Sequence, residues 1–225
     1  MGNAGSRTTD RVFFREVAEM SDPRHEYMRR LGVGVTERPA ASISLILLDW
    51  DDTLFCTTEV QRGRHLSCEQ LSELGARVNT LLHRCVRLAP TAIITNAMAG
   101  WVEHCVATYI PEVAPVLAHI QVISARSVFE ARFPNDPILW KCEAFAMLKD
   151  NSRQIANLIA IGDQEAEMEA VAGMAKLYHM AFVKSVRFVP KPHFEELLKE
   201  LSLTASKIQD ITHKAQCLRI SLQRI

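Results

Sequence analysis

Two aspartates that directly follow an aliphatic run are the residues best suited to chemistry in this chain. Residues 45–48 read Leu-Ile-Leu-Leu, which predicts a strand buried on both faces, as in parallel α/β sheets. Functional groups of such sheets lie beyond the carboxyl ends of the strands, where Asp49 and Asp51 fall. Two converging carboxylates repel each other unless a cation, a shared proton or a cationic side chain lies between them. The pair therefore predicts a metal site with acid/base or nucleophilic chemistry, and the alternative is an ordinary acidic turn.

Further along the chain, polar residues follow two more aliphatic strands and begin one helical stretch. Each has a structural alternative, namely a helix cap, a solvated charge or a turn. Lys149 is an alternative to Lys141 as the lysine near the helix start, but it lies towards the far end of the same helical stretch. The residues are Thr95 and Asn96 after the strand at 91–94, Lys141 near a helix start, and Asp163 after the strand at 158–162, with Glu167 one helical turn later.

Taken in order, these segments resemble the motifs of the haloacid-dehalogenase (HAD) superfamily. The first motif of that family is an aliphatic strand followed by Asp-x-Asp-x-Thr, which residues 49–53 match at every fixed position. The second ends a strand in Thr or Ser, the third is a lone Lys, and the fourth is Gly-Asp followed by another acid. The resemblance covers about residues 42–188, and four ordered motifs are far more specific than one.

The resemblance implies a phosphatase that uses magnesium. Asp49 would be the nucleophile that forms an aspartyl-phosphate. Asp51 would protonate the leaving oxygen and then deprotonate the attacking water. Mg²⁺ would be held by Asp49, the backbone carbonyl of Asp51 and Asp163. Dehalogenases of the superfamily lack the second Asp and its ion-pumping ATPases carry Thr there, so phosphatases and phosphomutases fit best.

The other matched residues would hold phosphate or support the site. Thr95 and the backbone amide of Asn96 would bind phosphate oxygens, and Lys141 would neutralise charge near the nucleophile. Glu167 would reach the metal through water or orient Lys141. Thr53 would stabilise the turn through its hydroxyl.

Strands and helices alternate through the centre of the chain, which predicts an α/β fold with a doubly wound, Rossmann-like parallel sheet. Ser67 and Gln70 form a capping box that opens a helix running to about residue 88. The resemblance implies the strand order 3-2-1-4-5. The predicted strands lie near residues 44–48, 91–95, 119–124, 157–161 and 178–183.

Three parts are expected: a helical N-terminal arm over residues 1–41, a core over 42–192 and a C-terminal helical segment over 193–225. The arm would hold one helix at 10–20 and a second between 22 and 32. Short elements use up the stretches between the first, second and third motifs, so no large cap domain is expected. A site without a lid is open to large phosphorylated substrates.

Composition excludes several classes of protein. Lys and Arg total 26 and so do Asp and Glu, without a basic stretch that interleaves aromatics, so no nucleic-acid partner is expected. Six cysteines without a Cys-x-x-Cys pair, in a chain with no signal peptide, predict reduced thiols in a cytoplasmic protein. No apolar run approaches the roughly 18 residues of a spanning helix.

The two ends suggest partners. Gly2 lies in the pattern Met-Gly-x-x-x-Ser, which is typical of N-myristoylation, and one such chain would give reversible peripheral membrane attachment. The alternative is an unmodified small-residue terminus. Apolar residues at alternating three-and-four spacing over 194–225 would suit a dimer or a partner helix, or a helix packed on its own domain.

The sequence thus predicts a capless, magnesium-dependent phosphomonoester hydrolase. A catalytically inactive binding or scaffold module of the same fold is one alternative. A phosphotransferase or phosphomutase is the other.

Overall fold

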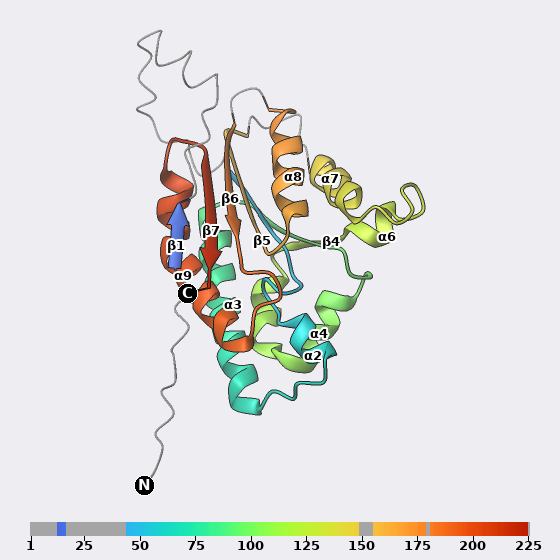
Figure 1. Ribbon diagram of the computed structural model, residues 1–225, viewed down its shortest axis with the longest axis vertical. Coiled ribbons are helices and arrows are strands. Elements are labelled where there is room, and N and C mark those ends of the chain that lie inside the picture. The colour runs from blue at the N-terminus through green and yellow to red at the C-terminus, as the bar shows by residue number, and fades with distance from the viewer. Residues whose placement is uncertain (1–12, 17–43, 149–154, 179–180, 225) are drawn as a thin grey trace.

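A seven-stranded sheet forms the centre of the protein (Figure 1). The computed structural model describes residues 13–16, 44–148, 155–178 and 181–224. Within them the strand order is β1-β7-β6-β5-β2-β3-β4, and all neighbours are parallel except β1 and β7. The predicted order 3-2-1-4-5 is confirmed for the strands from β2 to β6. The strands are β1 (Phe13–Glu16), β2 (Ser44–Leu48), β3 (Thr91–Thr95), β4 (Gln121–Ser124), β5 (Asn157–Gly162), β6 (Phe182–Arg187) and β7 (Leu218–Gln223).

Helices cover both faces of the sheet, as the doubly wound prediction requires. Ile46 and Leu48 of β2 pack with α3, α4 and α9, whereas Leu45 and Leu47 pack with α6, α7 and α8. This alternation explains why residues 45–48 are all aliphatic: both faces of the strand are core. The helices are α2 (Thr57–Gln61), α3 (Cys68–Leu88), α4 (Trp101–Tyr109), η2 (Pro111–Val113), α5 (Ala114–Leu117), α6 (Ala125–Phe129), α7 (Pro137–Met147), α8 (Glu165–Ala175) and α9 (Phe194–His213).

Helix α3 begins where its cap predicts. The Ser67 hydroxyl accepts from the Gln70 amide at 3.2 Å, and the Gln70 side chain accepts from the Ser67 amide at 3.0 Å. The two bonds satisfy amides that the first helical turn leaves without partners. Residues 54–140, all of which are described, hold one long helix, α3, and otherwise short elements of the core fold, so no cap domain is inserted there.

The C-terminal segment is only partly helical, which corrects the prediction for residues 193–225. Helix α9 ends at His213, and residues 218–223 form strand β7 beside β6. Leu218 and Leu222 are spaced by four, which fits a helix turn but equally fits one face of a strand. The apolar positions of α9, including Leu201 and Ile208, are buried inside the protein's own core. The predicted apolar seam is therefore used within the domain.

Two other predictions need correction. The last predicted strand, near 178–183, lies at residues 182–187, where it pairs with the whole of β5. The N-terminal helix predicted over 10–20 is wrong at residues 13–16, which form β1 against β7. An edge strand supplies unpaired backbone groups that a nearby segment can bind whatever its local pattern. The helix predicted between 22 and 32 lies outside the described residues.

No helix in the described ranges has both the length and the apolar character needed to cross a membrane.

A buried lysine joins the sheet to the end of α9. Lys184 of β6 is 0% exposed, and its Nζ donates to the backbone carbonyl of Thr212 at 2.9 Å. The Asn157 side chain donates to the same carbonyl at 2.8 Å. Burial disfavours the charged ammonium and lowers the pKa of Lys184 from 10.5 to about 7.

Lys184 should make the protein less stable as pH falls from 10.5 to about 7. In that window the unfolded chain binds a proton that the folded chain does not. The free energy of unfolding therefore falls by up to about 1.4 kcal/mol for each pH unit that the pH is lowered. Lys184→Met should remove this slope, measured as the difference in urea unfolding free energy from wild type across the window. Lys176→Met, an exposed control, should keep it. Parallel pH profiles for wild type and Lys184→Met would refute the assignment.

Candidate active site

Polar side chains from three adjacent strands meet at the carboxyl edge of the sheet. Asp49 follows β2, Asp163 follows β5 and Thr95 ends β3, and β2 lies between the other two strands. The Asp49 amide donates to the Ile161 carbonyl at 2.9 Å, which extends the β2–β5 pairing into the site. Asp49, Asp163 and Thr95 therefore lie at the same edge of the sheet, where the sequence predicts functional groups.

Three buried carboxylates form the centre of this edge. Asp49, Asp163 and Glu167 are 4%, 1% and 2% exposed, and each offers one oxygen within 4.8 Å of those of the other two. Such a group could bind a metal ion, since oxygen donors suit hard divalent cations. Asp163 Oδ1 is buried without a hydrogen-bond partner among the described residues, which leaves an acceptor available to a cation.

Within the described part of the chain, Lys141 of α7 supplies the one ammonium that contacts these acids. Its Nζ lies 2.6 Å from Asp49 Oδ1 and also contacts Glu167 Oε1, and its side chain is 3% exposed. Burial alone would lower the pKa of Lys141, but the attraction of both carboxylates outweighs it and raises that pKa. Lys141 thus lies beside Asp49 and contacts Glu167, and the predicted roles of Lys141 in charge neutralisation and of Glu167 in orienting it stay predictions.

Burial also acts on the pKa values of the two aspartates. Burial raises the pKa of Asp49 well above its usual range, against the opposing attraction of Lys141. Burial first, and then the negative charge of Glu167, raise the pKa of Asp163 to about 7. A cation among these oxygens would favour their ionised forms.

Glu167 is placed by the start of α8. Its Oε2 accepts from the Gln164 amide at 3.0 Å, as in a capping box, which turns the other oxygen towards Lys141. Gly162 makes room for this side chain, because a Cβ at Gly162 would lie 2.5 Å from Glu167 Cγ. Packing against Glu167 thus explains why glycine precedes Asp163.

Asp51 lies in a separate network next to the triad. Its Oδ1 accepts from the Thr57 hydroxyl at 2.7 Å and from Trp101 Nε1 at 2.8 Å, and its Oδ2 accepts from the Thr95 hydroxyl at 2.8 Å. These bonds fix the orientation of the carboxylate. Its side chain is not part of the acidic triad, and the prediction that its backbone carbonyl binds a metal stays a prediction.

The turn after Asp51 is held differently from the prediction. Asp52 has a left-handed φ of 56°, and its carboxylate accepts from the Thr58 amide at 2.8 Å and from the Thr58 hydroxyl. The Leu54 amide donates to the Trp50 carbonyl at 2.8 Å. Thr53 Oγ1 is buried and has no hydrogen-bond partner in the described structure, so its predicted role in the turn is wrong. Backbone bonds and Asp52 already serve that turn.

The two residues predicted to hold phosphate are engaged with the protein. Thr95 Oγ1 donates to Asp51 and accepts from the Ala97 amide at 2.9 Å. The Asn96 side chain donates to the Pro137 carbonyl at 3.2 Å, and its Oδ1 is buried without a partner among the described residues. Phosphate binding by Thr95 and by the Asn96 amide stays a prediction.

Two functional candidates were missed from the sequence, Thr57 and Trp101. Both begin helices that follow site strands, α2 and α4, but neither belongs to a motif. Their contact with Asp51 depends on how the helices are folded back over the edge of the sheet. Gly2, the predicted lipidation site, lies outside the described residues.

A search for similar family models, curated proteins and solved structures finds no match to this chain.

Lys141→Met should destabilise the protein in the absence of divalent cations, because it leaves Asp49 and Glu167 buried without their counter-charge. Removal of one partner from a buried ion pair costs about 3 kcal/mol or more. Urea unfolding in a chelator would measure the loss. The double variant Lys141→Met/Asp49→Asn should recover part of it. A loss no larger than that of the surface control Lys176→Met would contradict the role of the lysine.

Proposed function

We propose that this chain is a magnesium-dependent phosphomonoester hydrolase of the HAD type that works through an aspartyl-phosphate on Asp49. The observation that carries the proposal is the meeting of Asp49, Lys141, Asp163 and Glu167 in one buried cluster. Each of these residues comes from a segment that resembles a motif of that family. Ordinary helix caps and turns do not require three distant segments to converge.

The protein's own residues suit the two proton transfers of such a reaction. Lys141 occupies Asp49 Oδ1, so attack on phosphorus would come from Oδ2. As the new oxygen–phosphorus bond forms, the bond to the leaving oxygen breaks, and that oxygen takes a proton from the Asp51 carboxyl group. Water then attacks phosphorus, returns a proton to Asp51 and releases Asp49 with inorganic phosphate.

The network around Asp51 accommodates both of its protonation states. The Thr95 hydroxyl, which contacts Oδ2, can donate to a carboxylate or rotate to accept from a carboxyl group, while the Thr57 hydroxyl can donate to Oδ1 in both states. The indole of Trp101 only donates, so it would stay on the unprotonated oxygen. These residues are therefore proposed as positioning residues for the acid/base group.

A divalent cation fits the donors that remain. Asp49 and Asp163 would hold it together with the backbone carbonyl of Asp51, and Glu167 would support it directly or through Lys141. The cation would neutralise phosphate charge near the nucleophile. Magnesium is proposed because all the available ligands are oxygens.

The substrate and setting are part of the same proposal. No cap domain is inserted between residues 54 and 140, so a phosphate on a large molecule would have access to Asp49. The proposal also includes N-myristoylation of Gly2, which would attach this cytoplasmic enzyme reversibly to membranes.

The wild-type protein should release phosphate from an activated aryl phosphate with Mg²⁺ and lose this activity in a chelator. Asp49→Asn should lower kcat by at least about a thousandfold, because it removes the nucleophile. Circular dichroism should show an unchanged fold, and the surface control Asp210→Asn should keep the wild-type rate. If the wild-type protein binds Mg²⁺ but hydrolyses no phosphate ester, the binding-module alternative gains. Transfer of phosphate to an alcohol in place of water would indicate a phosphotransferase.

Trp101→Phe should lower kcat for alkyl phosphates by about tenfold, because Asp51 loses one of its fixing hydrogen bonds. Nitrophenolate leaves without a proton, so nitrophenyl phosphate should show a smaller loss in the step that forms the intermediate. Burst kinetics with both esters would separate the two cases. Equal losses for both esters would mean that Trp101 acts only on the general structure.

Gly2 should accept a myristoyl chain from an N-myristoyltransferase, and the modified protein should float with lipid vesicles. A single chain gives an association constant of only about 10⁴ per molar, so part of the protein should stay free. Intact mass would report the modification, with Gly2→Ala as the control. An unmodified terminus, or equal flotation of both proteins, would remove membrane attachment from the proposal.

A further inference from the structure

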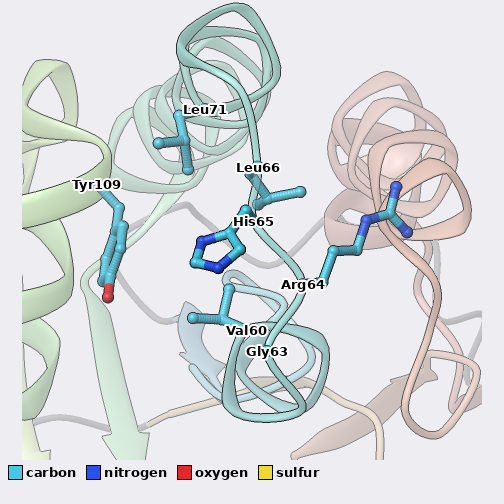
Figure 2. Close-up of a pocket in the computed structure, with 7 residues that line it drawn as sticks. All are labelled: Val60, Gly63, Arg64, His65, Leu66, Leu71 and Tyr109. Carbon is cyan, nitrogen blue, oxygen red and sulfur yellow. The ribbon is translucent and has the colours of Figure 1, made fainter.

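A cavity of about 250 Å³ lies between α2, the following loop, the first turn of α3 and the end of α4. These elements gather at the end of the molecule where the parallel strands finish, the lower end of Figure 1. Figure 2 shows the side chains that surround the cavity. They are Val60, Gly63, Arg64, His65, Leu66, Leu71 and Tyr109.

The walls of this pocket are continuous with the elements that hold Asp51. Thr57 donates to Asp51, and Val60 lies one turn further on the same face of α2, about 4.5 Å along its axis. Trp101 donates to Asp51 from the start of α4, and Tyr109 lies at the end of that helix, about 12 Å away.

A second connection runs through the turn after the first motif. The backbone of Phe55 pairs with that of Asp51, and the Phe55 ring lies 5.3 Å from the Tyr109 ring. The pocket is therefore on the order of 10 Å from the acid/base group, within reach of one extended substrate.

The lining suits an uncharged group. Arg64 points away from the other side chains in Figure 2, and its guanidinium binds Glu59 and Glu195, each at 2.9 Å. Its charge is thus already compensated outside the cavity. Aliphatic side chains form much of the wall. Among the described residues, neither the His65 ring nor the Tyr109 hydroxyl has a hydrogen-bond partner, so each could serve a polar substituent.

We propose that this pocket binds a ring-sized apolar group of the phosphate ester whose phosphate reaches Asp49. The assignment of that group to a substrate rests on the proposed function. The cavity is smaller than the roughly 300–1,000 Å³ of sites that enclose a whole drug-sized ligand, so it would take one ring and leave the rest of the substrate outside.

Matched esters with the same kind of leaving oxygen test the proposal. Phenylhexyl phosphate carries a ring at the end of a chain, and hexyl phosphate lacks the ring. A phosphoserine peptide with Phe three residues away places its ring about 10 Å from the phosphoserine, and the control peptide has Gly there. The ring should raise kcat/KM by about tenfold in the pair whose backbone matches the natural substrate. Equal kcat/KM within both pairs would overturn the proposal.

Variants of Leu71 locate the effect. Leu71→Ala removes part of the apolar wall and Leu71→Trp fills the cavity, so each should abolish most of the gain from the ring. Neither should change kcat/KM for hexyl phosphate by more than about twofold, because that ester does not fill the pocket. Leu177→Ala, in an exposed position beyond α8, is the control. A Leu71 variant that slows both esters equally would also overturn the proposal.

A binding measurement separates this proposal from the proposed function. Phenylhexanol, which has no phosphate, would be titrated into the inactive Asp49→Asn protein while the NMR signals of the His65 ring are followed. The signals, assigned with His65→Gln, should shift, and Leu71→Trp should prevent the shift. Hydrolysis of esters without this shift would refute the pocket alone. A Leu71-dependent shift without hydrolysis of any ester would uphold the ring site and refute the phosphatase.

Discussion

The ammonium group of Lys141 lies between carboxylates from two separate elements, and the candidate site depends on this contact. Asp49 leaves β2, Glu167 belongs to α8, and Lys141 reaches both from α7. A buried carboxylate without a counter-charge is costly, so the lysine permits two acids to stay buried at one point. The helices on that face of the sheet must therefore be placed so that Lys141 meets both acids.

The same contact explains why a cation fits this site. One ammonium faces the three carboxylates of Asp49, Asp163 and Glu167, and the pKa values of both aspartates are raised by burial. A divalent cation there would add positive charge and favour the ionised forms of these acids. Asp51 is kept apart from this excess of negative charge by its own donors. Two neighbouring aspartates of one motif thus have different surroundings, which suits a nucleophile and an acid/base group.

Much of the fold and of the site could be predicted because both depend on residues at strand ends. Unbroken aliphatic runs such as 45–48 and 158–161 identify strands buried on both faces, and parallel strands bring their carboxyl ends to one edge. Asp49, Asp163 and Thr95 follow from that rule. The pairing of β1 with β7 could not be predicted, because it joins the two ends of the chain through backbone groups. The helix predicted around Leu218 and Leu222 was wrong because a spacing of four residues fits both a helix and one face of a strand.

By itself the sequence determined the core strands, their helical connections, the capping box of α3 and the acids that end β2 and β5, because local pattern and periodicity specify these features. The tertiary structure alone decided which partners the polar groups meet. It placed Thr57 and Trp101 on Asp51, left Thr53 Oγ1 without a hydrogen-bond partner among the described residues and brought Tyr109 to the pocket beside α2. Such contacts depend on the packing of helices against the sheet, and no spacing along the chain encodes the direction in which a side chain crosses between two elements.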